Sequence, residues 1–160
     1  MNIYSLMSPI FLWAVISAPI YAKAVDTEAE ALASPQQLSD YFFAAARVGD
    51  IEVLSTFLDA GFPIDQANQK SYTALMVGAY AGQYSVTDLL LQRGANACLQ
   101  DKRGNTAIMG ALIKAEFRIV SLLYSYECDE SLINKSGMSL EEFARYWGQA
   151  DKLKELKDPA

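Results

Sequence analysis

The chain has 160 residues, of which 52% are apolar, and its formal net charge is −6. This length and composition fit one small folded domain with appendages and exclude a disordered chain. The scattered lysines and arginines are outnumbered by acidic residues, which argues against nucleic acid as a partner because phosphate backbones need a concentrated basic face.

Residues 1–24 have the features of a cleaved signal peptide. An apolar run at residues 10–16 precedes Ala22-Lys23-Ala24, which places small residues where signal peptidase reads the chain. We therefore expect export, with Val25 as the first residue of the mature protein. The alternative is an uncleaved membrane anchor, although the stretch from Met7 to Ala22 is shorter than the ~20 residues of a spanning helix and contains Pro9 and Pro19.

Ordered structure is expected to begin at Ser34. Residues 25–33 are acidic and rich in alanine, which predicts a flexible lead-in. Ser34 and Pro35 have the residue types of a helix start, and Gly49 ends the helical pattern. The apolar residues of this helix are Leu38, Tyr41, Phe42 and Ala45, and those of the helix capped by Asp50 are Ile51, Val53, Leu54, Phe57 and Leu58.

Residues 71–96 predict one turn and two short helices. Thr73 is a candidate N-cap, Gly82 separates the two helices and Gly94 ends the second one. Both helices are shorter than the ~12 to 15 residues at which an isolated helix becomes marginally stable, so neighbouring units must pack against them. Their core-facing residues are Leu75, Met76, Ala79, Val86, Leu89 and Leu90.

The same pattern recurs with a period of 33 residues. Small residues recur where helices approach closely, and large apolar residues recur where a core must be filled. Asparagine or aspartate recurs five residues before each capping threonine or serine, which predicts a turn at that point. The columns are Gly49, Gly82, Ala115 and Gly148; Ala45, Gly78, Ala111 and Ala144; Phe57, Leu90, Leu123 and Leu156; and Asn68, Asp101 and Asn134.

The last unit has the composition of a terminal cap. Its second helix, expected at Asp151–Leu156, keeps Leu153 and Leu156 as core residues and surrounds them with charged residues. The four units are expected at about 34–66, 67–99, 100–132 and 133–157, and no second domain is expected.

This pattern resembles the ankyrin-repeat family. The segments that match are Thr73-Ala74-Leu75-Met76, Thr106-Ala107-Ile108-Met109, Leu90-Leu91 and Gly94-Ala95-Asn96, and the frame holds over about three quarters of the chain. The resemblance implies an all-α solenoid of four helix-turn-helix units. Alanine at 74 and 107 replaces the usual proline, and methionine at 76 and 109 replaces the usual histidine, so we expect weaker hydrogen bonding between turns.

Cys98 and Cys128 allow two interpretations. An exported domain meets an oxidising environment, which favours a disulfide. Equivalent positions of stacked units lie about 10 Å apart, however, beyond the ~7 Å between Cα atoms that a disulfide allows. Because Cys128 occupies the column of the small residue Ala95, we expect two unpaired cysteines.

Few residues indicate catalysis or metal binding. The chain lacks histidine, which excludes a Ser-His or Cys-His pair and a histidine-ligated metal. Glu127, Asp129 and Glu130 form the densest acidic cluster and could hold Ca²⁺ or act as an acid/base pair. Their spacing matches no calcium loop, so a solvated loop is expected. We expect no enzyme activity and no cofactor.

The positions free of packing and turn constraints are the turn tips and the solvent side of each first helix. In ankyrin-like proteins these positions form a concave binding face. The alternative is that the aromatic residues cover the last unit and that the lysines form a solvated rim. Carried onto this chain, the predicted protein-binding residues are Lys70, Tyr72, Tyr80, Lys102, Arg103, Asn105, Ile113, Lys114, Met138, Tyr146 and Trp147.

The sequence therefore predicts a periplasmic or secreted monomer that binds another protein. The chain resembles small exported ankyrin-repeat proteins of bacteria. This resemblance suggests either an inhibitor or immunity protein, or an accessory factor of a periplasmic enzyme. A membrane-anchored scaffold, or an enzyme or metal protein, are the alternatives of other classes. We expect no nucleic-acid partner, and no membrane contact after signal cleavage.

Overall fold

The computed structural model describes residues 34–126, 128, 129 and 131–157. These residues form eight α-helices and no strand, as the sequence predicted. The predicted signal peptide and lead-in, together with Glu127 and Glu130, lie outside the described residues. The helices are α2 (Pro35–Val48), α3 (Ile51–Asp59), α4 (Ala74–Tyr80), α5 (Tyr84–Gln92), α6 (Ala107–Ile113), α7 (Phe117–Tyr124), α8 (Leu140–Tyr146) and α9 (Ala150–Lys157).

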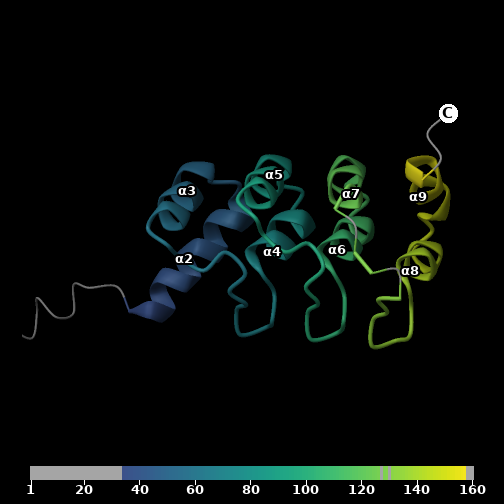
Figure 1. Cartoon of the computed structure of the whole chain (residues 1–160), viewed down its shortest axis with the longest axis horizontal. Coiled ribbons are helices and arrows are strands. Elements are labelled where there is room, and N and C mark those ends of the chain that lie inside the picture. The colour runs from purple at the N-terminus through teal and green to yellow at the C-terminus, as the bar shows by residue number, and fades with distance from the viewer. Residues whose placement is uncertain (1–33, 127, 130, 158–160) are drawn as a thin grey trace, which may run out of the picture. The chain divides into compact units, whose positions relative to one another are not determined.

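The helices pack as four antiparallel pairs in two rows (Figure 1). The first helices of the pairs, α2, α4, α6 and α8, form one row, and α3, α5, α7 and α9 form the other. A long turn precedes each of α4, α6 and α8 and extends beyond the first row. No helix in the described part of the chain has both the length and the apolar character needed to cross a membrane.

Side-chain caps set where several helices begin. The Thr73 hydroxyl accepts a hydrogen bond from the Met76 N–H at 3.3 Å, and the Asp50 carboxylate accepts one from the Val53 N–H at 3.0 Å. At α8, Ser139 forms a reciprocal capping box with the third helical residue, Glu142. These contacts satisfy N–H groups that have no partner within the helix, and they confirm the predicted caps at Thr73 and Asp50.

Each predicted turn is held by its asparagine or aspartate. The side-chain oxygen of Asn68 accepts hydrogen bonds from the N–H groups of Lys70 and Tyr72, at 2.9 and 3.1 Å. Asp101 and Asn134 accept the equivalent pairs of bonds in the next two turns. The three turns therefore have the same internal hydrogen bonds, which present the residues at their tips in the same way.

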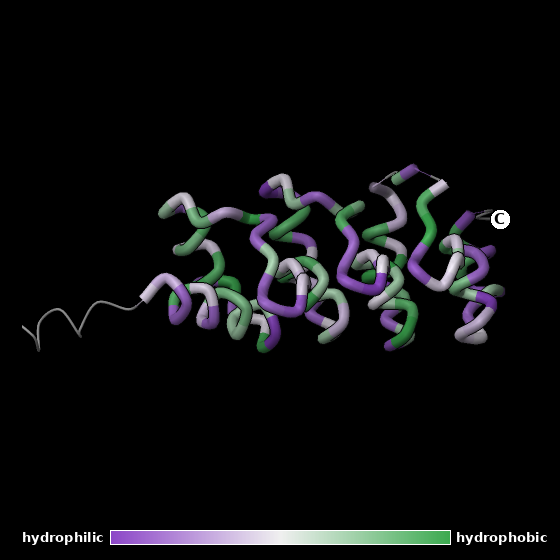
Figure 2. Tube along the Cα trace, turned by 90° about the horizontal axis from the view of Figure 1, so that it is seen from below, coloured by the Kyte–Doolittle hydropathy of each residue, from purple (hydrophilic) through white to green (hydrophobic). Residues whose placement is uncertain are grey.

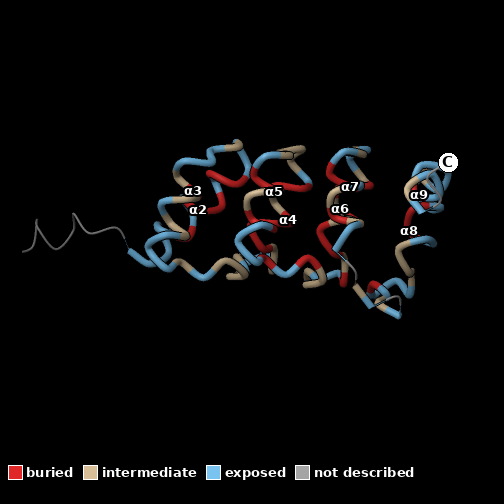
Figure 3. The backbone as a smooth tube through the Cα atoms, turned by 45° about the horizontal axis from the view of Figure 1, so that its top comes forward, coloured by how far each residue is buried: buried red, intermediate tan, exposed pale blue. Residues whose placement is uncertain are grey.

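A continuous core runs between the two rows (Figure 3). Tyr41 and Ile51 of the first pair are exposed instead, as is Leu38, although the helical spacing placed them with the apolar residues. These side chains differ from their neighbours because no described helix packs on that side of the first pair. The largest fully buried side chains are Phe42, Leu54, Leu75, Leu90, Leu112 and Ile119.

The expectation of two unpaired cysteines is wrong. Cys98 and Cys128 form a disulfide, with their Cα atoms 5.5 Å apart. The two residues are 30 positions apart, three fewer than one period, so they do not occupy equivalent positions. Three residues of extended chain span about 10 Å, which is roughly the spacing between units. The segment after α5 thus carries Cys98 across to the loop that follows α7.

Neighbouring turns are joined by direct hydrogen bonds. The Lys135 N–H donates to the Arg103 carbonyl at 2.9 Å, and the Asn134 side-chain amide donates to the Asn105 side-chain oxygen at 3.0 Å. The Lys102 ammonium donates to the Gln69 carbonyl at 2.7 Å. The turns therefore form a connected ridge along one side of the stack.

Gly104 permits this close approach between two turns. Its φ is +77°, and a Cβ at this position would lie 2.8 Å from the Lys135 backbone nitrogen. Gly137, one period later, has a similar φ of +75°, but no atom lies within 4 Å of the position that its Cβ would occupy. Both substitutions to alanine are strained by the positive φ, but only the first one also pushes against backbone.

We expect Gly104→Ala to lower the free energy of unfolding by about 1 to 3 kcal/mol more than Gly137→Ala does. The difference isolates the steric clash, because both variants have the same backbone strain. Urea unfolding of the two variants and the parent protein measures it. Equal losses for the two variants would contradict the close contact between these turns.

Three carboxyl groups near the end of the chain have pKa values below their usual range. Hydrogen bonds from the Ser131 hydroxyl and backbone N–H lower the pKa of Asp129, and a hydrogen bond from Lys157 lowers the pKa of Glu141. The Ser139 backbone N–H and hydroxyl lower the pKa of Glu142. Glu142 is therefore ionised at neutral pH, the state in which it accepts the capping-box hydrogen bond.

Candidate functional site

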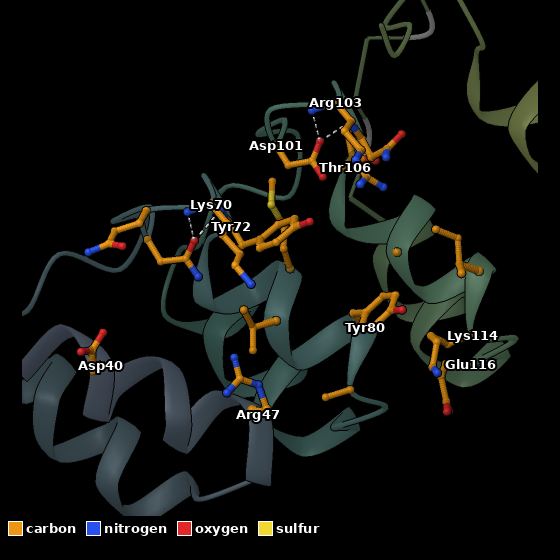
Figure 4. Close-up of a pocket in the computed structure, with 18 of the residues that line it drawn as sticks. Asp40, Arg47, Lys70, Tyr72, Tyr80, Asp101, Arg103, Thr106, Lys114 and Glu116 are labelled. Carbon is orange, nitrogen blue, oxygen red and sulfur yellow. Dashed lines mark hydrogen bonds between the residues drawn. The ribbon is translucent and has the colours of Figure 1, made fainter. Parts of the chain in front are cut away.

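A groove of about 980 Å³ runs along the solvent side of the first-helix row and the adjoining turns (Figure 4). Its residues come from α2, α4 and α6, from the turns before α4 and α6, and from the end of α8. Eight of the predicted binding residues line this groove. They are Lys70, Tyr72, Tyr80, Arg103, Asn105, Ile113, Lys114 and Trp147.

Three predicted residues do not line the groove. Lys102 is directed to the Gln69 carbonyl of the preceding turn. Met138 is half-buried and packs against the core. Tyr146 is 73% exposed and makes an edge-to-face contact with Trp147, their ring centroids 5.8 Å apart. The fourth unit thus reaches the groove through Trp147.

The groove also contains residues of the first helix that the sequence prediction left out. Gln36, Asp40 and Arg47 lie on α2 and line the groove. Arg47 is one period before Tyr80, so continuing that column backwards would have identified it. Gln36 is likewise one period before Gln69, another groove residue. Asp40 had no such signal, because α2 extends over the positions that form a turn in the later units.

The centre of the groove is apolar and aromatic. Tyr80 is 50% exposed, whereas Tyr72 and Ile113 are half-buried. Gly110 of α6 has no side chain to cover the floor beside Tyr80; a Cβ there would lie 3.8 Å from the Tyr80 Cβ. Aromatic side chains bring large contact area at low entropic cost, so this centre is suited to hold an apolar group of a partner.

Basic side chains surround this apolar centre. Arg47, Lys70, Arg103 and Lys114 are all exposed, and none forms an ion pair with a described carboxylate. Lys114 lies over the Tyr80 ring, with its ammonium 5.2 Å from the ring centroid. Figure 4 shows these groups around Tyr72 and Tyr80.

The turns that border the groove are mainly hydrophilic, and apolar residues concentrate in the helices (Figure 2). Within the described part of the chain, no group of three or more cysteine and acidic side chains is placed to hold a metal ion. The arrangement provides an extended surface with an apolar centre and a charged border, which is typical of a site that binds a protein segment.

Comparison with known proteins agrees with this architecture. A family model described as ankyrin repeats, in three copies, matches residues 41–136. This range contains most of the first helix pair and all of the next two, and the fourth pair follows it.

Several curated proteins are similar over parts of the chain. An ankyrin repeat-containing protein of Treponema pallidum is 30% identical over 102 residues, which are 63% of this chain and 34% of that protein. Protein HOS4 of Saccharomyces cerevisiae is 38% identical over 68 residues, 42% of this chain and 6% of its own. Ankyrin repeat, SAM and basic leucine zipper domain-containing protein 1 of Neofelis nebulosa is 32% identical over 77 residues, which are 48% of this chain and 16% of that protein. The chain spans about a third or less of the length of these relatives.

Proposed function

Since the chain belongs to the ankyrin-repeat family, we propose that it is an exported protein whose groove binds a segment of another protein. Repeats of this family bind other proteins. The proposal adds that this chain is exported and that it binds its partner through this groove. The observation that carries it is the groove itself, where exposed aromatic residues are surrounded by basic side chains without ion pairs.

Two features support export. The sequence of residues 1–24 has an apolar run followed by Ala-Lys-Ala, as a signal peptide does. The bond between Cys98 and Cys128 is of the kind that persists in oxidising compartments such as the periplasm or the extracellular space. Both features favour a periplasmic or secreted protein. Retention of residues 1–24 in the mature protein would instead favour a membrane-anchored scaffold.

Two biological roles are compatible with such a groove. An inhibitor or immunity protein would bind a toxin in a one-to-one complex and abolish the toxin's activity. An accessory factor would support a periplasmic enzyme, whose activity would fall in its absence. The identity of the captured partner distinguishes these roles, so the first experiment is capture with the mature chain from Val25 onward, tagged at Ala160.

The capture experiment needs a variant with substitutions in the groove and a matched variant with substitutions on another surface. The groove contains a cation–π pair, Lys114 over Tyr80, that joins two neighbouring units. The second-helix row contains another, with the Arg118 guanidinium 4.6 Å from the Tyr84 ring centroid. Tyr84 and Arg118 do not line the groove.

We expect Tyr80→Ala/Lys114→Ala to weaken partner binding by about thirtyfold or more, the loss typical of an interface hot spot. Tyr84→Ala/Arg118→Ala should leave the affinity within about twofold, because surface substitutions outside the interface rarely contribute. Titration calorimetry with the captured partner measures both. Similar losses in the two variants would refute the assignment of this groove.

A further inference from the structure

We propose, building on the proposed function, that the groove selects an acidic protein segment that carries a large apolar side chain. The segment would lie extended along the groove, with its apolar side chain at the centre and its carboxylates beside the surrounding basic groups. Three properties of the groove support this proposal: its charge, the position of its own carboxylates and the shape of its floor.

The groove has the opposite charge from the rest of the protein. It contains four basic and three acidic side chains, a net charge of +1, so that the remainder of a chain of net charge −6 carries −7. Three basic residues elsewhere form ion pairs: Arg93 with Asp59, Lys152 with Glu155, and Lys157 with Glu141. The groove cations instead have no described carboxylate as a partner. A negatively charged ligand would supply the partner for these cations.

The groove's own carboxylates do not neutralise these cations. The Asp101 carboxylate accepts the N–H groups of Arg103 and Asn105 within its turn. Asp40 accepts the Gln36 side-chain amide on α2. The Glu116 carboxylate lies against the preceding unit, 2.8 Å from the position that a Cβ of Gly82 would occupy. The basic groups remain available to a partner.

The floor of the groove accommodates an apolar side chain. Gly110 lies inside α6, where glycine is less favourable than alanine by about 1 kcal/mol, and only Tyr80 would contact its Cβ. Gly78, the glycine inside α4, is different because its Cβ would lie 3.0 Å from the Val86 side chain. Packing within the fold therefore accounts for Gly78, whereas at Gly110 the missing side chain leaves the groove open beside Tyr80.

Selection from a display library of short random peptides tests this proposal, with the mature chain as the target. Arg47→Glu/Arg103→Glu reverses two groove charges. Arg118→Glu/Lys154→Glu makes the same change in net charge away from the groove, at two residues that do not line it. The third variant, Gly110→Leu, fills the floor and leaves every charge in place.

We expect the selected peptides to be acidic and to contain an aromatic or branched aliphatic residue. Their affinity should fall by about tenfold or more with Arg47→Glu/Arg103→Glu and with Gly110→Leu, stay within about twofold with Arg118→Glu/Lys154→Glu, and fall as salt concentration rises. Circular dichroism of each variant verifies that the helices remain folded.

Other outcomes separate this inference from the proposed function. Neutral or basic peptides that still depend on Gly110 and Tyr80 would overturn the charge selectivity and leave a protein-binding groove. Peptides whose binding no groove substitution affects would overturn both. Equal binding of an unstructured single-stranded oligonucleotide would overturn the selectivity too, because any polyanion would then satisfy the site.

Discussion

Replacing Cys98 and Cys128 together by serine is expected to lower the free energy of unfolding by about 3 to 4 kcal/mol. The disulfide joins residues 30 positions apart and so restricts the unfolded chain, which loses entropy on ring closure. Urea unfolding of the oxidised protein and of the double variant measures the difference.

Reduction provides the control for this result. The parent protein in dithiothreitol should unfold at nearly the same urea concentration as the double variant, and the variant should not respond to dithiothreitol. Thiol titration in denaturant should detect no free thiol in the oxidised parent. Two free thiols in the untreated parent would show that the bond is absent from the isolated protein.

Phe42→Ala is expected to cost about 3 to 5 kcal/mol of folding free energy. Phe42 is fully buried in the first helix pair, and its ring centroid lies 4.5 Å from that of Phe62 and 5.7 Å from that of Phe57. Truncation removes these aromatic contacts and leaves a cavity that neighbouring side chains fill only partly. Thermal and urea unfolding of the variant measure the loss.

Tyr41→Ala is the matched control, because this adjacent aromatic residue on the same helix is 63% exposed. Its loss should change the unfolding free energy by no more than about 0.5 kcal/mol. A comparable cost for both variants would mean that the first helix pair packs differently. A negligible cost for Phe42→Ala would mean that this pair contributes little to the stability of the stack.

The helices could be predicted because the repeat supplies the same evidence several times. Asn68, Asp101 and Asn134 form one column, and each of them holds its turn with the same hydrogen bonds. In the column of capping residues, Thr73 accepts a hydrogen bond from its helix, whereas the Thr106 side chain does not. Local hydrogen bonds depend on nearby residues, which the sequence shows directly. The groove residues from Lys70 to Lys114 followed from the same columns once the family resemblance fixed the exposed side.

The disulfide and the ends of the stack required information that the columns do not contain. The period gives the spacing of equivalent residues, but Cys98 and Cys128 are offset by three residues and meet through the path of an irregular segment. Arg47 and Tyr146 belong to the same column as Tyr80, yet only Arg47 lines the groove with it. A terminal unit has one neighbour, so its side chains do not keep the surroundings of the inner units.

The disulfide also determines how the protein transmits force. The bond between Cys98 and Cys128 encloses α6 and α7, so tension applied to the two ends of the chain passes through sulfur and bypasses both helices. Stretched at about 3.6 Å per residue, the enclosed segment would otherwise lengthen the chain by about 100 Å. Under load the two helices of the third unit are thus protected, and among the described helices only those of the other three units can be extended.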